Sequence, residues 1–277
     1  MNMQKRFILN ADDVGMHPAV DEAVLHLAES GIVSSASVMV LEQPDAGTLL
    51  ALQRGGVDLG LHFDLTSAAA ASRHGLPGSV GALLARAYTG WLDRQKLRDI
   101  IDEQLQRFSE VAGRMPVFID GHEHVHQFPV VRDALMQVLS RWPVQERPFL
   151  RDTRPRRWRG AKASVIGMLG ANGLAARAGK LHCARNTDFL GVYPLQHEVD
   201  LHALWRGWLQ AMPAQGALAM CHPASSVFAA GNAFRLREYL FLCSAAFAEM
   251  RNQYNINIVG WHAALRETPD GAAFCAG

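Results

Sequence analysis

The sequence predicts an α/β fold in which parallel strands alternate with helices to form a (β/α) barrel. Short β-like runs alternate with helical stretches through about seven or eight units, which is typical of parallel βαβ architecture. Polar residues gather at the C-terminal end of nearly every expected strand, where parallel α/β proteins hold their active sites. No glycine-rich G-x-G-x-x-G turn follows the first strand, which disfavours a doubly wound dinucleotide-binding sheet.

Length and composition agree with one large barrel. Barrels of this class run to about 250 residues as a single unit, so we expect one domain over residues 1–277. Hydrophobic residues make up 49% of the chain and charged residues 19%, a composition that excludes a disordered protein. The formal net charge of +1 gives no indication of a nucleic-acid partner.

The expected strands are short apolar runs, most of which end in polar residues. The first, "RFILNADD", enters a polar turn directly, and "VFIDGH" and "GALAMCHP" follow the same pattern. We expect strands at residues 6–13, 34–40, 57–66, 117–122, 148–152, 216–223 and 255–263.

Helices are expected between these strands. Pro18 suits the first turn of a helix whose apolar residues recur at helical spacing. Further helices are predicted at 93–112, 129–141 and 233–251, and residues 67–90 form an excursion rich in Ala, Gly and Ser. The apolar segment 163–179 lacks the ~18 uninterrupted apolar residues of a membrane span. We expect a buried helix there, with contact to a lipid-like substrate as the alternative.

Acidic residues, histidines and an arginine collect at the expected rim of the barrel. They are Asp12, Asp13, His62, Asp64, Asp120, His122, Arg151, Asp152 and His222. Because successive side chains of a strand point to opposite faces, His122 is expected at the strand end, facing the barrel mouth. His124 and His126 are expected in the loop that follows. Asp13 would point away from Asp12 unless the chain turns there, and the stretch "DDVG" indicates such a turn.

Two histidines and a carboxylate at one rim suit a divalent metal with open positions for water. One of the paired aspartates would then bind the metal, and its neighbour would accept a proton from the water. His222, at another strand end, has a pKa range suited to protonating a leaving amine. Each feature alone has a simpler interpretation: an interior histidine for His62, a turn for the aspartate pair, a solvated loop for the histidine run. Their joint placement at strand ends favours a metal site.

Several stretches together resemble the YdjC-like family of carbohydrate deacetylases. They are "NADDVG" (10–15), "GLHFDLT" (60–66), "DGHEHVHQFP" (120–129), "LRDTR" (150–154), "CHP" (221–223) and "RLREYLFLCS" (235–244). The resemblance implies a deformed TIM-like (β/α) barrel with a divalent metal at the C-terminal strand ends. Carried over by motif, the metal ligands would be Asp13, His62 and His122. By analogy with related polysaccharide deacetylases, Asp12 would be the base and His222 the acid.

The same resemblance bears on the residues around the metal site. Arg151 would orient Asp12, and we expect Asp64, His124 and His126 to contact the substrate. Val14 stands where many members of the family have an aromatic residue, and "GHEH" has fewer histidines than the chitooligosaccharide enzyme. These departures leave the metal motif intact and concern the sugar specificity.

The expected activity is that of a metal-dependent hydrolase, a carbohydrate N-deacetylase that releases acetate. Its substrate would be an N-acetylglucosamine-type oligosaccharide or glycolipid, and its cofactor one divalent ion, Mg²⁺ or Zn²⁺. The alternatives are a metal-dependent phosphoesterase or cyclic amidohydrolase, which also use H-x-H near a strand end, and a non-catalytic sugar-binding module.

Cysteine spacing and the N-terminal stretch bear on where the protein acts. Cys183, Cys221, Cys243 and Cys275 have no C-x-x-C spacing, so we expect reduced thiols in a cytosolic protein. The N-terminal stretch enters a strand without the apolar core of a signal peptide. We therefore expect a cytoplasmic protein without a transmembrane segment, and the sequence leaves a homodimer open.

Overall fold

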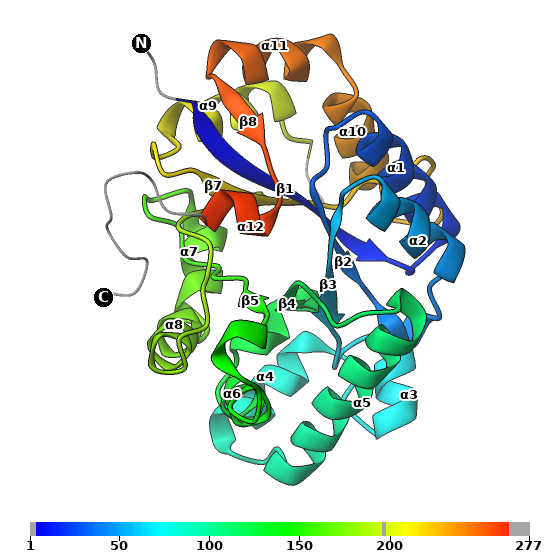
Figure 1. The fold of residues 1–277 in the computed structure, drawn as a ribbon, viewed down its shortest axis with the longest axis vertical. Helices are drawn as coiled ribbons and strands as arrows, with labels where there is room; N and C mark the ends of the chain where they lie inside the picture. Colours follow the sequence, from blue (N-terminus) through cyan, green and yellow to red (C-terminus); the bar gives the residue numbers. More distant parts are fainter. Residues whose placement is uncertain (1–3, 196–197, 266–277) are drawn as a thin grey trace.

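The computed structural model describes residues 4–195 and 198–265, and its centre is a curled sheet of parallel strands (Figure 1). The strands are β1 (Lys5–Val14), β2 (Ser35–Val38), β3 (Asp58–Phe63), β4 (Phe118–Gly121), β5 (Phe149–Leu150), β6 (Phe189–Leu190), β7 (Ala217–Cys221) and β8 (Ile256–Ile258). Their order is β5-β4-β3-β2-β1-β7-β6, and β8 pairs with β1. The predicted (β/α) barrel is thus confirmed.

Two features deform this barrel. The long strand β1 pairs with β7 over Phe7–Ala11 and with β8 over Lys5–Phe7, so the last two strands share one neighbour. On the opposite side, the described residues join β5 to the segment before β6 only by an isolated bridge between Leu150 and Arg185. The sheet therefore curls around its core without forming a regular closed ring.

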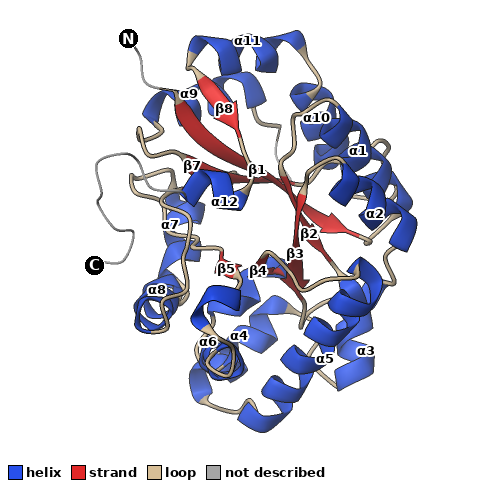
Figure 2. Ribbon diagram, in the orientation of Figure 1, coloured by secondary structure: helices blue, strands red, loops and turns tan. Residues whose placement is uncertain are grey.

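Helices surround the sheet (Figure 2). The α-helices are α1 (Pro18–Glu29), α2 (Ala46–Arg54), α3 (Ala68–His74), α4 (Val80–Thr89), α5 (Arg94–Ala112), α6 (Val131–Leu139), α7 (Ala161–Met168), α8 (Ala171–Lys180), α9 (Leu201–Ala211), α10 (Ala233–Leu242), α11 (Ala245–Gln253) and α12 (Trp261–Leu265). Three 3-10 helices complete the description: η1 (Val40–Glu42), η2 (His122–Gln127) and η3 (Val144–Glu146).

Local chemistry explains where these helices begin. Pro18 occupies the first turn of α1, and Nδ1 of His17 accepts a hydrogen bond from the Ala19 amide. Asp93 caps α5 by accepting from the amides of Gln95 and Lys96. Apart from the short β5 and β8, the strands are buried along nearly their whole length, as expected for parallel strands covered on both faces.

Two expected helices are each divided in two, and these predictions were wrong in that respect. The segment 163–179 is broken at Gly170, whose φ is +117° and whose missing Cβ would lie 2.1 Å from the carbonyl oxygen of Gln127. Its first part, α7, buries only Ala163, and Met168 is 70% exposed, so a fully buried helix is also wrong. The segment 233–251 is interrupted because Ser244 caps a new helix by accepting from the Phe247 amide.

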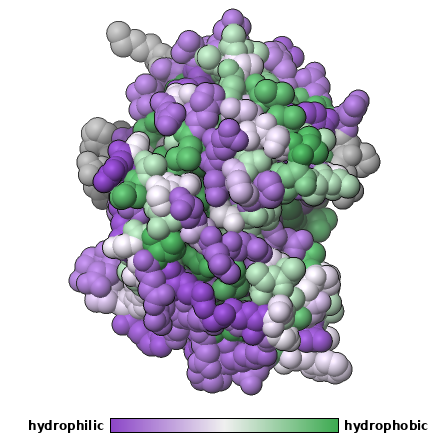
Figure 3. All heavy atoms as spheres, turned by 90° about the vertical axis from the view of Figure 1, so that its right-hand side faces the viewer, coloured by the Kyte–Doolittle hydropathy of each residue, from purple (hydrophilic) through white to green (hydrophobic). Residues whose placement is uncertain are grey.

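Other differences are smaller. The excursion 67–90 contains the short helices α3 and α4, and the expected strand 255–263 is reduced to β8. Strand β6 was not predicted, because its two residues carry no periodicity. No helix among the described residues is long and apolar enough to cross a membrane. Hydrophilic and hydrophobic residues are interspersed on the face shown in Figure 3.

The cysteines of the described ranges are free thiols. Cys183 and Cys221 are buried and Cys243 is exposed. Cys275, which the sequence prediction included, lies outside the described residues.

Candidate active site and metal centre

The end of β1 brings two adjacent carboxylates to one place. Asp13 has a φ of +73°, a left-handed conformation that is uncommon outside glycine. Its carbonyl accepts from the amide of Met16 at 3.0 Å, and Gly15 follows with a φ of +92° and a missing Cβ that would lie 2.7 Å from Cβ of Pro44. The chain therefore turns at "DDVG" as predicted, and both Asp12 and Asp13 line one cavity.

Asp13, His62 and His122 form a cluster that could hold a metal ion. Oδ1 of Asp13 lies 3.3 Å from Nε2 of His62 and 3.1 Å from Nδ1 of His122. One ligand atom from each of the three residues lies within 4.8 Å of the other two. The cluster joins the end of β1, the strand β3 and the start of η2, which are three separate elements.

Asp120 orients His62 within this cluster. Nδ1 of His62 donates to Oδ1 of Asp120 at 2.6 Å, and Nε2 of the same ring faces Asp13. Carboxylate–histidine contacts of this kind commonly fix the tautomer of a metal-binding histidine. Burial opposes a charge on His62, but Asp120 and the nearby Asp13 raise its pKa to about 10. The donor set therefore fits a divalent cation, which would take the place of a proton between imidazole and carboxylate.

Asp120 was not predicted to act in the site, although it was recognised at the rim. Its other oxygen, Oδ2, accepts from Oγ of Ser37 at 2.6 Å and lies 2.5 Å from Nη2 of Arg151. The signal that would have found its role is the register of β3 and β4, which pairs His62 with Asp120. A single sequence does not contain that register.

Asp12 is held on both of its oxygens. Arg151 donates from Nη1 to Oδ2 at 2.7 Å and from Nη2 to Oδ1 at 2.6 Å, and Asn10 donates to Oδ1 at 2.6 Å. Burial would raise the pKa of Asp12, but Arg151 outweighs it and lowers that pKa well below its usual range. Asp12 is thus an ionised, firmly oriented carboxylate at neutral pH.

His222 lies on the other side of Asp12, at the end of β7. Its Nε2 is 3.8 Å from Oδ2 of Asp12. Its backbone amide donates to Oε2 of Glu238 at 2.6 Å, and its Nδ1 lies 4.0 Å from the same oxygen. Burial lowers the pKa of His222 to about 4.

Glu238 of α10 was not predicted as part of the site. Burial raises its pKa to about 7, and Tyr193 forms a hydrogen bond with its carboxyl group. Arg235, on the same helix, was also missed. Its Nη2 donates to Oδ2 of Asp13 at 2.6 Å. Burial would raise the pKa of Asp13, but Arg235 contributes to lowering it well below its usual range.

Asp12, the three residues of the metal cluster, His222 and Arg235 line one cavity of about 410 Å³ at the C-terminal ends of the strands. Its polar floor includes the metal cluster, Asp12 and His222. Its walls are largely apolar: Val80, Phe128, Ile166, Leu169, Val192, Leu195, Met220 and Phe234. Lys162 adds one cationic side chain, whose Nζ donates to the carbonyl of Tyr193 at 2.9 Å.

The three residues expected to contact substrate lie in different surroundings. His124 lines the cavity, and its Nδ1 has no hydrogen-bond partner. His126 is buried behind it, where Nε2 contacts the carbonyl of Arg151 at 3.0 Å. Oδ1 of Asp64 accepts from the amides of Thr66 and Ser67. Neither Asp64 nor His126 is among the residues that line the cavity, so their contacts favour a supporting role.

His124 and His126 lie beyond the strand, as expected, and the strand ends one residue earlier than the sequence predicts. Strand β4 ends at Gly121, and the following residues form η2. Glu123 and His124 have φ values of +51° and +60°, so the side chains no longer alternate as they do on a strand. Such conformations in residues other than glycine store strain and cluster at functional sites.

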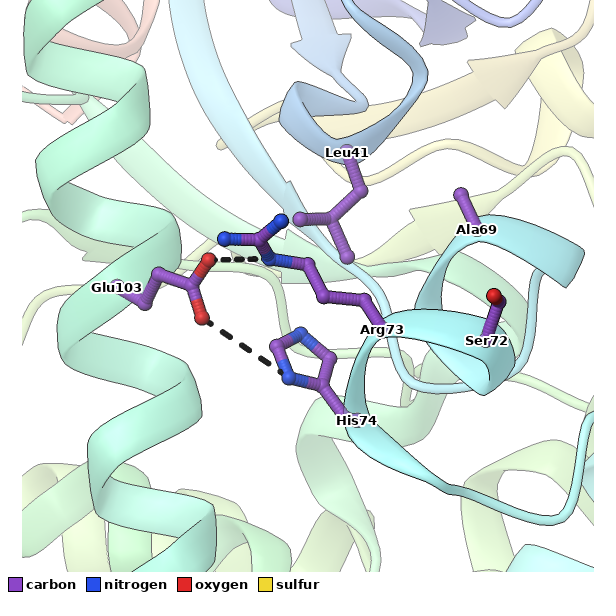
Figure 4. A pocket seen from close by; sticks show the side chains of 6 residues that line it. All are labelled: Leu41, Ala69, Ser72, Arg73, His74 and Glu103. Carbon is purple, nitrogen blue, oxygen red and sulfur yellow. Dashed lines mark hydrogen bonds and ion pairs between the residues drawn. The ribbon is translucent and has the colours of Figure 1, made fainter.

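A second depression lies elsewhere on the surface (Figure 4). It is lined by Leu41, Ala69, Ser72, Arg73, His74 and Glu103. Nε of Arg73 donates to Glu103 at 2.5 Å, and these side chains are 47% and 31% exposed. Exposed ion pairs of this kind contribute little to stability, and no member of the metal cluster lines this depression.

Comparison with known proteins places these observations in context. The family model described as YdjC-like protein matches residues 6–253. Chitooligosaccharide deacetylase from Yersinia pestis bv. Antiqua (strain Angola) is 34% identical over 135 residues, covering 47% of this chain and 53% of that protein. Chitooligosaccharide deacetylase from Serratia marcescens is 34% identical over 142 residues, with the same coverage. The chain thus spans about half the length of the curated relatives it matches.

Solved structures share the fold. A protein from Enterococcus faecalis V583, provisionally named a cellobiose-phosphate cleavage protein, has a TM-score of 0.67 at 17% identity, covering 94% of this chain and 98% of that chain. An uncharacterized protein from Agrobacterium tumefaciens C58 has a TM-score of 0.56 at 12% identity, covering 94% and 89%. At these identities the likeness concerns the architecture alone.

Proposed function

Because the chain belongs to the YdjC-like protein family, we propose that it is a metal-dependent hydrolase that removes the N-acetyl group from an amino sugar. The observation that carries this proposal is the arrangement of two neighbouring carboxylates with distinct surroundings. Asp13 faces two histidines, whereas Asp12 is held by Arg151 beside the same cavity. The curated relatives named chitooligosaccharide deacetylase support the same reaction.

Asp13, His62 and His122 would hold one divalent ion. When bound, such an ion polarises a carbonyl group and lowers the pKa of a bound water. Two imidazoles and one carboxylate favour Zn²⁺, because Mg²⁺ prefers oxygen ligands. Among the ranges 4–195 and 198–265, this is the one cluster of its kind. A two-metal phosphoesterase is therefore less well supported than a deacetylase.

The protein's own residues then supply the proton transfers. Asp12, kept ionised by Arg151, orients the attacking water and accepts a proton from it. As the carbon–oxygen bond forms, the carbon–nitrogen bond of the amide weakens. His222 lies 3.8 Å from Oδ2 of Asp12, so a small movement would let the proton pass to the imidazole. His222 would deliver it to the departing nitrogen, giving a free amine and acetate.

The cavity supports a substrate with an apolar group beside the sugar. Ile166 and Leu169 of α7, together with Val192 and Phe234, present hydrocarbon around a polar floor. In binding sites of this kind the walls are largely apolar, and a few polar groups fix the orientation of the ligand. This lining favours an amino-sugar glycolipid, whereas the names of the relatives favour an N-acetylglucosamine oligosaccharide. His124, which lines the cavity, is proposed to contact the sugar.

The decisive experiment combines metal analysis with product detection. The purified chain should contain about one divalent ion, and acetate release should be measured over N-acetylated oligosaccharides, N-acetylated glycolipids and phosphate esters. We expect acetate from an N-acetylated sugar, loss of activity on chelation, and loss of metal in His62→Ala. Metal-dependent cleavage of the phosphate esters alone would reject the deacetylase proposal, and sugar binding without any turnover would favour the non-catalytic alternative.

A further inference from the structure

The two oxygens of Asp13 have different partners. Oδ1 faces His62 and His122, at 3.3 and 3.1 Å, on the side of the proposed metal. Oδ2 accepts a hydrogen bond from Nη2 of Arg235 at 2.6 Å. One oxygen is thus available to a cation, and the other is already engaged by a permanent positive charge.

Arg235 is buried in this position, but only part of its hydrogen-bonding capacity is used there. Its side chain is 7% exposed and lies over the ring of Phe234, 5.4 Å from the ring centre. Besides Asp13, Nη2 also contacts Sδ of Met16 at 3.6 Å. Its Nε and Nη1 have no hydrogen-bond partner among the described residues. The guanidinium therefore makes one strong contact, with a single carboxylate oxygen.

The neighbouring pair shows that this contact is not the usual way to hold an aspartate. Arg151 donates hydrogen bonds from two nitrogens to both oxygens of Asp12, at 2.7 and 2.6 Å. That bidentate geometry is the common and stronger arrangement between Arg and a carboxylate. An arginine present only to stabilise the fold would be expected to use it at Asp13 as well. The one-point contact leaves Oδ1 free, which a bidentate contact would not.

We propose that Arg235 is a positioning residue that confines Asp13 to ligation through one oxygen and thereby sets the preference of the site among divalent ions. This inference rests on the metal site of the proposed function, but not on deacetylation itself. With Oδ2 engaged, Asp13 gives one oxygen beside two imidazoles, a low-coordinate set that suits Zn²⁺. A free Oδ2 would add a second carboxylate oxygen, which benefits oxygen-preferring ions such as Mn²⁺ more than Zn²⁺.

The test compares Arg235→Met, Arg235→Lys and the control Arg206→Met, all in the full chain. Arg206 is an exposed arginine of α9 that does not line the cavity, so its replacement removes one positive charge without touching the site. Competition between Mn²⁺ and Zn²⁺ is measured by equilibrium dialysis and metal analysis. The visible spectrum of the Co²⁺-loaded proteins gives a second readout, because Co²⁺ absorbs more strongly at low coordination number. Neither readout requires turnover.

We expect Arg235→Met to lower the preference for Zn²⁺ over Mn²⁺ by about 10-fold, in the lower part of the range known for groups that contact metal ligands. The Co²⁺ absorption should weaken in the same variant. Arg235→Lys, which keeps a donor and a charge, and Arg206→Met should both stay near wild type. An unchanged preference in a folded Arg235→Met protein, or equal weakening of both ions without a spectral change, would overturn the inference. A wild-type chain that binds no divalent ion would overturn both this inference and the metal site, whereas binding without deacetylation would leave this inference standing.

Discussion

Asp120 of β4 accepts a hydrogen bond from Nδ1 of His62 on β3 at 2.6 Å, and this contact turns Nε2 of His62 toward Asp13. The same carboxylate lies 2.5 Å from Arg151, which holds Asp12. One buried side chain thus supports both the proposed metal ligand and the proposed base.

Replacing Asp120 with Asn should weaken metal binding without removing any ligand. The amide keeps the shape of the side chain but loses the negative charge that makes His62 a stronger metal ligand. Such changes typically cost about 10–100-fold in metal affinity. Competition with a chelator would measure the effect. Asp102→Asn, which alters an exposed carboxylate paired with Arg141, is the matched control. Equal affinities for the two variants would show that Asp120 does not act through His62.

The two adjacent aspartates should respond differently to the same substitution. Asp12→Asn should keep its metal and lose turnover by about 10²–10⁴-fold, because an amide does not accept the proton of the water. Asp13→Asn should lose metal first, because Oδ1 is the oxygen that faces both histidines. Metal content measured beside the rate for each protein distinguishes the roles. Metal loss in Asp12→Asn with retention in Asp13→Asn would reverse our assignment.

His222→Ala should affect substrates according to their leaving group. An amine leaves poorly without a proton, and a positioned acid contributes about 10²–10⁴-fold. Cleavage of an N-acetyl amine should therefore slow greatly, whereas an acetyl ester of a good phenol leaving group should be largely spared. The measurement is the rate of acetate release from both substrates by the wild type and the variant. Equal losses on the two would favour a histidine that only supports the site.

Glu238→Gln should change how the free energy of unfolding depends on pH. Burial raises the pKa of Glu238 from 4.5 to about 7, so its contribution to stability is fully present below pH 4.5 and is lost as pH rises through 7. At ~1.4 kcal/mol for each pKa unit, the loss is about 3 kcal/mol. The neutral Gln should remove this loss. The free energy of unfolding of the variant should therefore rise relative to that of the wild type as pH increases from 4.5 to 7.

Denaturant unfolding of both proteins across this range provides the measurement. His222 contributes with the opposite sign, because burial lowers its pKa to about 4 and its stabilisation is lost as pH falls from 6.5 toward 4. Tyr193 and Arg235 also face Glu238, and both are present in the wild type and the variant. The difference between the two curves therefore reports Glu238. Parallel curves would contradict the prediction.

The sequence was sufficient to predict the fold and the positions of the rim residues, because both follow from local patterns. Parallel strands place their C-terminal ends at one edge, so Asp13, His62 and His122 could be expected to lie together from their positions along the chain. The turn at Asp13 could be predicted because Gly15 follows it. These inferences need only the alternation of elements and the polar residues at their ends.

What the sequence did not reveal depends on contacts between distant segments or on unusual backbone angles. The role of Asp120 follows from the register of β3 and β4, and the role of Arg235 from where α10 packs. The left-handed Glu123 and His124 give the segment after β4 a backbone that the sequence pattern does not signal. No rule of periodicity signals such angles in residues other than glycine.

Helix α10 carries Arg235 to Asp13 and Glu238 to His222, and the first of these contacts bridges a long stretch of chain, as does the pair of Arg151 with Asp12. Arg235 and Asp13 are 222 positions apart, and Arg151 and Asp12 are 139 apart. Contacts of such separation carry a loop-closure cost and slow the folding of the chains that rely on them. During synthesis, the proposed ligands Asp13, His62 and His122 are made long before Arg235, which is proposed to limit Asp13 to one ligating oxygen. A metal site with the proposed selectivity would therefore be complete only once the C-terminal part of the chain has folded against the N-terminal part.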